Sequence, residues 1–230
     1  MPDITIACPD GAFSAYLASP TGNSGGGVLV IQEIFGVNKD MRDHCDHLAA
    51  QGYFALCPDI FWRQEPGIQI TDQSEEEWAK AFELYQGFDV DKGVADLKVA
   101  LAHLRTVEGC TGKAGTVGFC LGGLLAYLMA AESDAECNVS YYGVGIDERL
   151  AAADGITAPT LLHIAEEDGF VPKEAQAKIK DGLGGHPSIS LHSYPGVDHA
   201  FARHAGVNYD AAAATLADSR TMECFNANLG

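Results

Sequence analysis

Short, unbroken runs of apolar residues recur along this 230-residue chain, and most are followed by a longer stretch with helical spacing. The clearest run is VLVIQ at residues 28–32, where leucine and β-branched residues follow one another without polar alternation. A strand of this kind is buried on both faces, as in parallel sheets covered by helices. The pattern therefore predicts an α/β fold: a mostly parallel central sheet of about seven to eight strands with helices on both faces.

Turn and capping residues set the expected boundaries. Asp10-Gly11 separates the two strands of an N-terminal hairpin, and Ser74, followed by three glutamates, marks a helix start. We expect strands at 4–7, 12–17, 28–32, from 53 to near Pro58, 114–119, 138–143, 159–165 and 188–194, and helices at 40–51, 74–87, 90–107, 121–131, 172–183 and 209–226. No internal repeat or low-complexity linker interrupts the pattern, so a single domain over residues 1–230 is expected.

Charge and composition exclude several classes of protein. The chain has 32 acidic and 14 basic residues, a formal net charge of −18, and should repel nucleic acid and anionic membranes. No apolar run approaches the ~18 residues of a membrane span, and the N-terminus lacks a secretory signal. Seven scattered cysteines without a CxxC pair favour free thiols in a reducing cytoplasm. We expect a cytoplasmic monomer or homodimer that binds a small molecule.

The turn GFCLGG at residues 118–123 carries the first sign of chemistry. It joins a predicted strand to a predicted helix with Cys120 at its centre, which is the nucleophile-elbow pattern with cysteine in place of serine. The helix N-terminus beneath Cys120 would favour a thiolate and stabilise an oxyanion. The alternative is a buried structural cysteine in a tight turn. A phosphate-binding loop is disfavoured, because neither glycine fingerprint of such loops is present.

An elbow of this kind requires an acid and then a histidine, each just after a later strand. Asp168 follows the strand TLLHIA, and His199 follows the strand SISLHSY. His199 would act as the base and Asp168 would orient it. Glu166 and Glu167 are rival acids, but they lie closer to the end of the strand. The ordered set predicts a Cys–His–Asp triad.

The other histidines have simpler interpretations. His163 and His192 fall inside predicted strands, which favours core or sheet-face positions. His44 and His47 lie one helical turn apart, like half of a metal site, but no third ligand accompanies them. We favour a solvated helix face and predict no metal.

With these residues placed, the sequence resembles the dienelactone hydrolase family of α/β-hydrolases. The resemblance covers nearly the whole chain and rests on six stretches: QEIFGVN, GYFALCPDIFWRQEPG, GFCLGG, YYGVG, EEDGFVP and DHAFAR. It implies an enzyme that opens an unsaturated lactone carrying a carboxylate, with a Cys–His–Asp triad and no cofactor.

The resemblance also implies roles for further residues. Glu33 would contact the cysteine and hold it protonated until substrate binds; the alternative is a loop acid. Ile34 and Leu121 would donate the two backbone N–H groups of the oxyanion hole. Arg203 would bind the substrate carboxylate bidentately, unless it is a surface arginine. The substrate-binding candidates are Arg203, Trp78, Phe35, Tyr85, Tyr142 and Phe201.

The sequence departs from the family pattern in two places. Enzymes that act on dienelactone carry a second arginine in the helix near residues 74–88, where this chain has none and Trp78 aligns instead. Ala200 stands where the family often has a small hydroxyl residue. The loss of one cationic anchor weakens the case for a carboxylated lactone, and a tryptophan favours a flatter, more apolar group.

The leading interpretation is thus a cytoplasmic, cofactor-independent hydrolase of activated esters or lactones. An alternative within this class is a broad esterase for uncharged aryl esters, with phosphotriesterase activity through the same nucleophile and oxyanion hole. An alternative of another class is a non-catalytic redox-thiol sensor or binding protein on the same scaffold. The complete ordered triad argues against the sensor.

Overall fold

The computed structural model describes residues 3–22 and 24–230. The strands follow the hydrogen-bonded order β1-β2-β4-β3-β5-β6-β7-β8, so the predicted α/β fold with a mostly parallel sheet is confirmed. The chain forms two compact units: one reaches to Gly115 and includes Leu229, and the other comprises Thr116–Asn228 with Gly230. The prediction of a single domain stays a prediction.

The first unit contains the hairpin and the start of the parallel sheet. Its strands are β1 (Asp3–Cys8), β2 (Gly11–Ala18), β3 (Gly25–Ile31) and β4 (Phe54–Pro58), and β5 (Cys110–Phe119) begins in it. β1 pairs antiparallel with β2, and β3 pairs parallel with β4. Residues 28–31 of β3 are fully buried, as the unbroken apolar run predicts.

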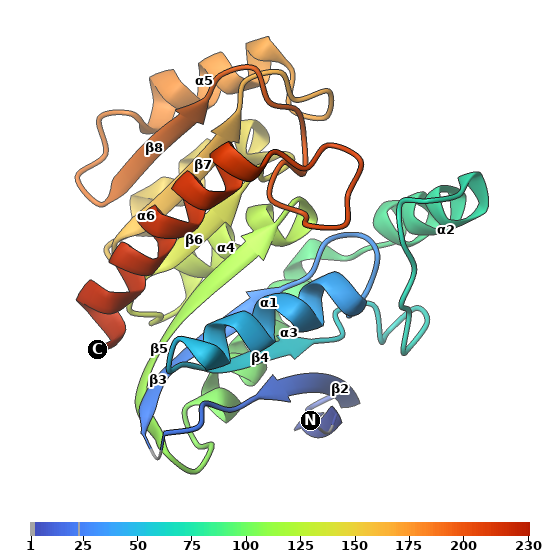
Figure 1. The fold of residues 1–230 in the computed structure, drawn as a ribbon, viewed down its shortest axis with the longest axis vertical. Helices are drawn as coiled ribbons and strands as arrows, with labels where there is room; N and C mark the ends of the chain where they lie inside the picture. The colour runs from blue at the N-terminus through green and yellow to red at the C-terminus, as the bar shows by residue number, and fades with distance from the viewer. Residues whose placement is uncertain (1–2, 23) are drawn as a thin grey trace. The chain divides into compact units, whose positions relative to one another are not determined.

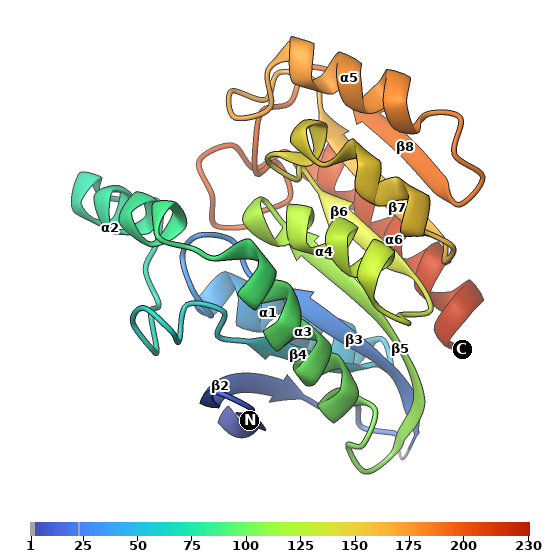
Figure 2. The same ribbon diagram turned by 180° about the vertical axis from the view of Figure 1, so that it is seen from behind.

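Three helices belong to this unit: α1 (Lys39–Ala50), α2 (Glu75–Gln86) and α3 (Val90–Leu104). α1 and α3 cover opposite faces of its strands, whereas α2 stands away from them (Figures 1 and 2). Each helix has a polar N-cap, and the Ser74 side chain accepts a hydrogen bond from Glu77 N. The predicted start of α2 is therefore confirmed.

The second unit is built around the parallel strands that bear the predicted triad. It contains the end of β5, β6 (Asn138–Tyr141), β7 (Thr160–Ala165) and β8 (Ile189–Tyr194), with α4 (Leu121–Glu132), α5 (Lys173–Leu183), α6 (Ala211–Leu229) and two 3₁₀ segments at Ile146–Glu148 and Leu150–Gly155. Within this unit α6 covers one face of the strands, and α4 and α5 cover the other (Figures 1 and 2).

Two features of this unit position the site. Helix α4 is buried along residues 121–130, which explains why its sequence is apolar on all sides. Strand β6 ends at Tyr141, two residues before the predicted boundary, because Tyr142 adopts a left-handed conformation with φ of 40°. The carboxyl ends of these strands are where α/β sheets place their active sites.

No helix in the described residues is both long and apolar enough to cross a membrane. The predicted cytoplasmic location and the monomeric or homodimeric state stay predictions.

Candidate active site

The turn between β5 and α4 has the geometry of a nucleophile elbow. Cys120 has φ 56° and ψ −114°, a strained conformation that L-residues rarely adopt. A Cβ atom on Gly118 would lie 1.8 Å from the Gly122 oxygen, and one on Gly123 would lie 2.6 Å from the Tyr141 oxygen. Only glycine fits at these two positions, so the turn can form only with this sequence pattern.

The start of α4 provides hydrogen-bond donors beside the thiol. Leu121 is the first helical residue, and a residue in the first turn has no intrahelical acceptor for its N–H. Cys120 N donates to Tyr141 O at 3.1 Å, and Cys120 O accepts from Gly123 N at 3.0 Å. The cysteine backbone is thus held by the sheet on one side and by the helix on the other.

The acid is fixed by the loop that follows β7. Asp168 is 5% exposed, and its Oδ1 accepts hydrogen bonds from Phe170 N at 2.8 Å and Val171 N at 3.0 Å. Asp168 Oδ2 lies 2.9 Å from His199 Nδ1. The rival acids form ion pairs elsewhere, Glu166 with Lys180 at 3.8 Å and Glu167 with Lys173 at 3.0 Å. Asp168 is therefore the acid that contacts the histidine.

The histidine is held by the loop that follows β8. His199 is 4% exposed, and its backbone N–H donates to Asp198 Oδ1 at 2.6 Å. The same oxygen accepts from Gly169 N at 3.0 Å, so Asp198 ties the histidine loop to the acid loop. The next residue, Ala200, has φ of 63°.

The electrostatics link His199 to both predicted partners. Burial by itself lowers the pKa of His199, but the charges and hydrogen bonds of Cys120 and Asp168 outweigh it and raise the pKa to about 10. Within the described residues Nε2 of His199 is buried and makes no hydrogen bond of full geometry. Catalytic hydrogen bonds often tighten only when substrate binds.

Aromatic rings surround the imidazole. Tyr142 lies 5.0 Å from His199 between ring centroids, and Phe201 lies 5.5 Å from Tyr142. Phe170 lies 4.8 Å from His199 and is 45% exposed. Tyr142 and Phe201 are predicted site residues, whereas Phe170 is missed by the sequence reasoning. Its signal is an apolar residue in the polar turn EEDGF, two positions after Asp168.

Arg203 also belongs to this unit. It is only 7% exposed, which is unusual for a solvated surface arginine. Its backbone N–H donates to Ala200 O at 3.0 Å, and its side chain packs closely over Gly206, where a Cβ atom would lie 2.9 Å from Arg203 Cδ.

The remaining predicted site residues lie in the first unit. Glu33, Ile34 and Phe35 follow β3 and are all buried. Trp78 packs edge-on against Phe35 at 5.1 Å, and its Nε1 donates to Asp72 O at 3.0 Å. Tyr85 lies half-buried on α2. The roles predicted for these residues toward the triad stay predictions.

The described residues contain no group of three or more His, Cys, Asp or Glu side chains able to hold a metal ion. His44 lies 3.5 Å from Asp40 on α1. His163 is buried in β7 and bonded at both ring nitrogens to hydroxyl groups. The core position expected for His163 is confirmed, and His47 is exposed as expected, but the solvated helix face is wrong for His44, whose side chain is only 14% exposed because it packs against Asp40.

Comparison with known proteins gives a consistent assignment. The profile of the family described as "Dienelactone hydrolase family" matches residues 13–229. A protein of Azospirillum brasilense provisionally named carboxymethylenebutenolidase is 51% identical over 233 residues, covering 100% of both chains. Carboxymethylenebutenolidase 1 of Cupriavidus pinatubonensis is 39% identical over 213 residues, covering 93% of this chain and 91% of that protein.

A solved structure from Klebsiella pneumoniae, provisionally described as a dienelactone hydrolase, superposes with a TM-score of 0.88 at 25% identity. The superposition covers 98% of this chain and 97% of the other. Because the family profile spans almost the whole chain and relatives above 30% identity cover more than nine-tenths of it, this chain belongs to the dienelactone hydrolase family.

Proposed function

We propose that this chain, a hydrolase of esters or lactones, acts through a triad of Cys120, His199 and Asp168. One observation carries the proposal: His199 is bonded to Asp168 at 2.9 Å and has a pKa raised to about 10 through its contacts with Cys120 and Asp168. A buried imidazole between a carboxylate and a thiol at an elbow is the arrangement that activates a cysteine nucleophile.

In the acylation step, Cys120 gives its thiol proton to His199, and Cys120 Sγ attacks the carbonyl carbon of the ester or lactone. The carbonyl oxygen becomes an oxyanion, which accepts a hydrogen bond from Leu121 N–H and, by the predicted role, from Ile34 N–H. The C–O bond then breaks, and the His199 imidazolium gives its proton to the leaving alkoxide. The product of this step is a thioester on Cys120 and a free hydroxyl group.

In the deacylation step, His199 changes from acid to base. The thioester sulfur is neutral, so the pKa of His199 falls once the negative charge of Cys120 is gone. The neutral imidazole accepts a proton from water, and the hydroxide attacks the thioester carbonyl. Expulsion of the Cys120 thiolate releases the acid and frees Cys120 and His199 for another cycle. Asp168 holds the ring in one orientation throughout.

The surroundings of His199 support a planar, unsaturated acyl group. Phe170, which is 45% exposed, presents an aromatic ring 4.8 Å from the imidazole between ring centroids, and such a ring stacks on conjugated substrates. Arg203 is the candidate anchor for a substrate carboxylate. The absence of a second arginine on α2, where Trp78 stands, leads us to propose activated neutral aryl esters alongside carboxylated lactones as substrates.

A substrate panel with two cysteine variants tests the proposal. Wild-type protein, Cys120→Ala and the matched control Cys137→Ala are assayed with dienelactone, p-nitrophenyl acetate and a neutral aryl phosphotriester. We expect turnover of at least one carboxylic substrate by wild type and Cys137→Ala, and none by Cys120→Ala. Hydrolysis of the phosphotriester would extend the substrate range to phosphoryl groups. Inactivity of the wild type on the whole panel would favour the redox-thiol sensor instead.

A further inference from the structure

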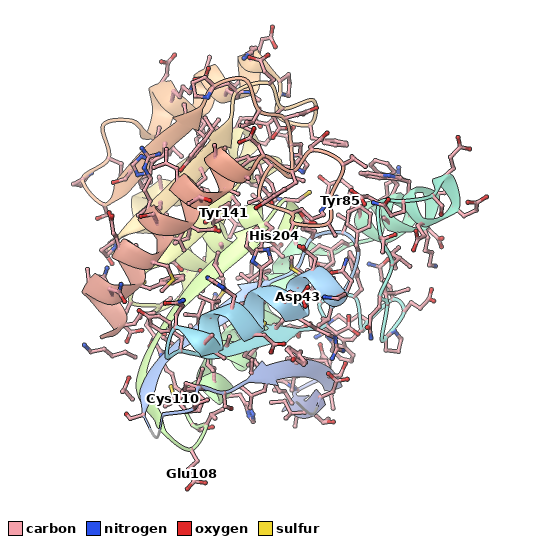
Figure 3. All side chains as sticks on the ribbon, viewed as in Figure 1. Asp43, Tyr85, Glu108, Cys110, Tyr141 and His204 are labelled. Carbon is pink, nitrogen blue, oxygen red and sulfur yellow. The ribbon has the colours of Figure 1, made fainter. Side chains whose placement is uncertain are left out.

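A second group of buried polar side chains lies in the same unit as the triad and has no part in the mechanism above. Strands β6, β7 and β8 and helix α6 contribute to it. Figure 3 labels one member, Tyr141, which lies near α6 in that view. The members are Tyr141, His163, Tyr194, Asp218, Arg220 and Thr221.

The hydrogen bonds in this group run in one direction. Arg220 can only donate, and it donates from Nη1 to Tyr194 Oη at 3.0 Å. Tyr194 must then give its own hydrogen to His163 Nδ1, at 2.8 Å. His163 Nδ1 is therefore an acceptor, so the proton of the neutral ring resides on Nε2.

The same logic continues to the other end. His163 Nε2–H donates to Thr221 Oγ1 at 3.1 Å. Thr221 then donates to Tyr141 Oη at 2.7 Å, because Tyr141 gives its hydrogen to Asp218 Oδ1 at 2.9 Å. We call this chain of five hydrogen bonds the Arg220–Asp218 relay. Each hydroxyl in it accepts one hydrogen bond and donates one.

The relay requires a neutral His163. A protonated ring would donate from both nitrogens and would leave Tyr194 without its acceptor. Burial, followed by the nearby charges of His192 and Arg220, holds the pKa of His163 well below its ordinary value. The charged or titratable groups that face the ring are His192 on β8 and Arg220 on α6, with Asp218 at the end of the relay.

One peptide bond, between Tyr141 and Tyr142, is hydrogen-bonded both to the proposed active site and to a residue of the relay. Tyr141 O accepts a hydrogen bond from Cys120 N at 3.1 Å, and Tyr142 N donates to His163 O at 2.8 Å. The peptide between Tyr141 and Tyr142 is thus held on one side by the proposed nucleophile and on the other by a relay residue. A shift of β6 would move both.

The backbone conformation of Tyr142 makes this peptide dependent on the contacts that hold it. Its φ of 40° is strained for a bulky side chain and persists only when neighbouring contacts enforce it. In this conformation the ring is 2% exposed and lies 5.0 Å from the His199 ring. If β6 relaxed, the ring would be free to leave the imidazole and admit water beside it.

We propose that the Arg220–Asp218 relay is a positioning element for the catalytic base: by fixing Tyr141 and His163, it holds the Tyr142 ring against His199. His163, Thr221 and Tyr141 are positioning residues in this sense, and none of them touches substrate. The inference rests on the proposed role of His199 in hydrolysis.

Thr221→Val tests the relay at its centre, because valine keeps the shape of threonine and removes the hydroxyl. Thr221→Ser restores that hydroxyl. Thr215→Val is the matched control: Thr215 is exposed on the same helix, and its Oγ1 bonds only locally, to Ala211 O at 2.7 Å. Tyr194→Phe, which removes the donor to His163 Nδ1, is the second variant should Thr221→Val fail to fold.

In a p-nitrophenyl acetate assay we expect Thr221→Val to lower kcat about ten- to hundredfold with KM changed less than about twofold, because the base is misplaced rather than the substrate site. Thr221→Ser should recover most of the rate. The pH at which His199 titrates should move toward the ordinary value of imidazole. Loss of thermal stability with unchanged kcat and unchanged His199 titration would overturn the proposal.

Long-range ¹H–¹⁵N spectra give a readout that needs no activity. In the wild type, His163 should carry its proton on Nε2 and should not titrate between about pH 5 and 9; in Thr221→Val its Nε2–H signal should shift. A proton on Nδ1, or a titrating His163, would overturn the relay. Inactive wild-type protein with the expected His163 spectrum would instead refute the proposed function and leave the hydrogen-bond chain standing.

Discussion

Substitution of Cys120 by alanine should lower the pKa of His199, because it imitates the loss of the thiolate on acylation. Ordered by size, the effects that raise this pKa are the charge of Cys120, the hydrogen bond to Asp168, the hydrogen bond to Cys120 and the charge of Asp168. Cys120 therefore supplies the largest single contribution to the total rise. That total exceeds the span from 6.5 to about 10, because it also overcomes burial.

The expected magnitude follows from these two facts. Loss of the largest contribution that raises the pKa of His199 should bring it in Cys120→Ala well below about 10, toward the ordinary value of imidazole. Each pKa unit of this fall corresponds to about 1.4 kcal/mol of interaction between His199 and Cys120. Acylation of Cys120 should lower the pKa of His199 in the same way, and His199 would then act as a base instead of a proton donor.

An NMR titration of the His199 Cε1–H signal from about pH 5 to 11 measures this change, with the signal assigned by its absence in His199→Gln. Cys137→Ala is the matched control, since this buried free cysteine of the same unit interacts with the thiol of Cys224 and not with His199 in the determinants of either pKa. The control should titrate like the wild type. If His199 titrated near pH 10 in Cys120→Ala as well, the thiolate would not be the cause of the raised pKa, and the acid-to-base step would be wrong.

The raised pKa of His199 also predicts the direction in which kcat/KM changes with pH. Below about pH 10 the imidazolium paired with Cys120 keeps the proton that the leaving group needs. As the pH rises through about 10 that proton is lost, so kcat/KM for an ester with a poor leaving group should fall. An ester with a good leaving group, such as a p-nitrophenyl ester, should show a smaller fall in a parallel pH–rate profile.

Further variants test single features of the site. Gly123→Ala should destabilise the protein by about 2 kcal/mol or more in urea unfolding, because its Cβ would lie 2.6 Å from a backbone oxygen, whereas Gly185→Ala, with nothing within 4 Å, should stay within about 0.5 kcal/mol. Phe170→Ala, at a 45% exposed position, should raise KM for aryl esters and leave stability unchanged. Glu33→Gln should alter the rate at which iodoacetamide labels Cys120; an unchanged rate would reduce Glu33 to a loop acid. Trp78→Arg should shift kcat/KM toward carboxylated lactones by roughly ten- to hundredfold, and a wild type that already prefers them would contradict the reasoning.

The sequence predicts the elbow well because the physical constraint is local. Only glycine fits at positions 118 and 123, so the pattern GFCLGG is itself evidence for the turn. Asp168 and His199 are predictable for a related reason, since each directly follows a strand whose apolar run is easy to recognise. Chain order and strand ends are enough to identify them.

The relay could not be predicted in this way. His163 and Tyr194 have the character of ordinary strand residues, and Thr221 lies 58 positions from His163 along the chain. Their meeting depends on how α6 lies across β6, β7 and β8 in the second unit, and neither periodicity nor spacing encodes this. Phe170 is missed because loop sequences do not reveal which apolar side chain faces the site. The strand predicted at 138–143 is too long because a tyrosine in a strand-like run gives no indication of the left-handed backbone that Tyr142 adopts.

Backbone strain connects these observations. Among the described residues, the non-glycine residues with positive φ are Cys120, Tyr142 and Ala200, and all three follow the carboxyl ends of β5, β6 and β8. Each costs roughly 1–3 kcal/mol, a large sum for a protein of marginal stability, so each needs local support. Cys120 is held by the elbow glycines, and Ala200 follows a loop tied down by Asp198. Tyr142 is followed by Gly143, which packs tightly against Gly123, and its ring contacts the rings of Phe119, Tyr141, His199 and Phe201. The hydrogen bonds of its own peptide and of Tyr141 add to this support. This is why the buried relay, although it touches no substrate, should influence the rate of the reaction more than the binding of the substrate.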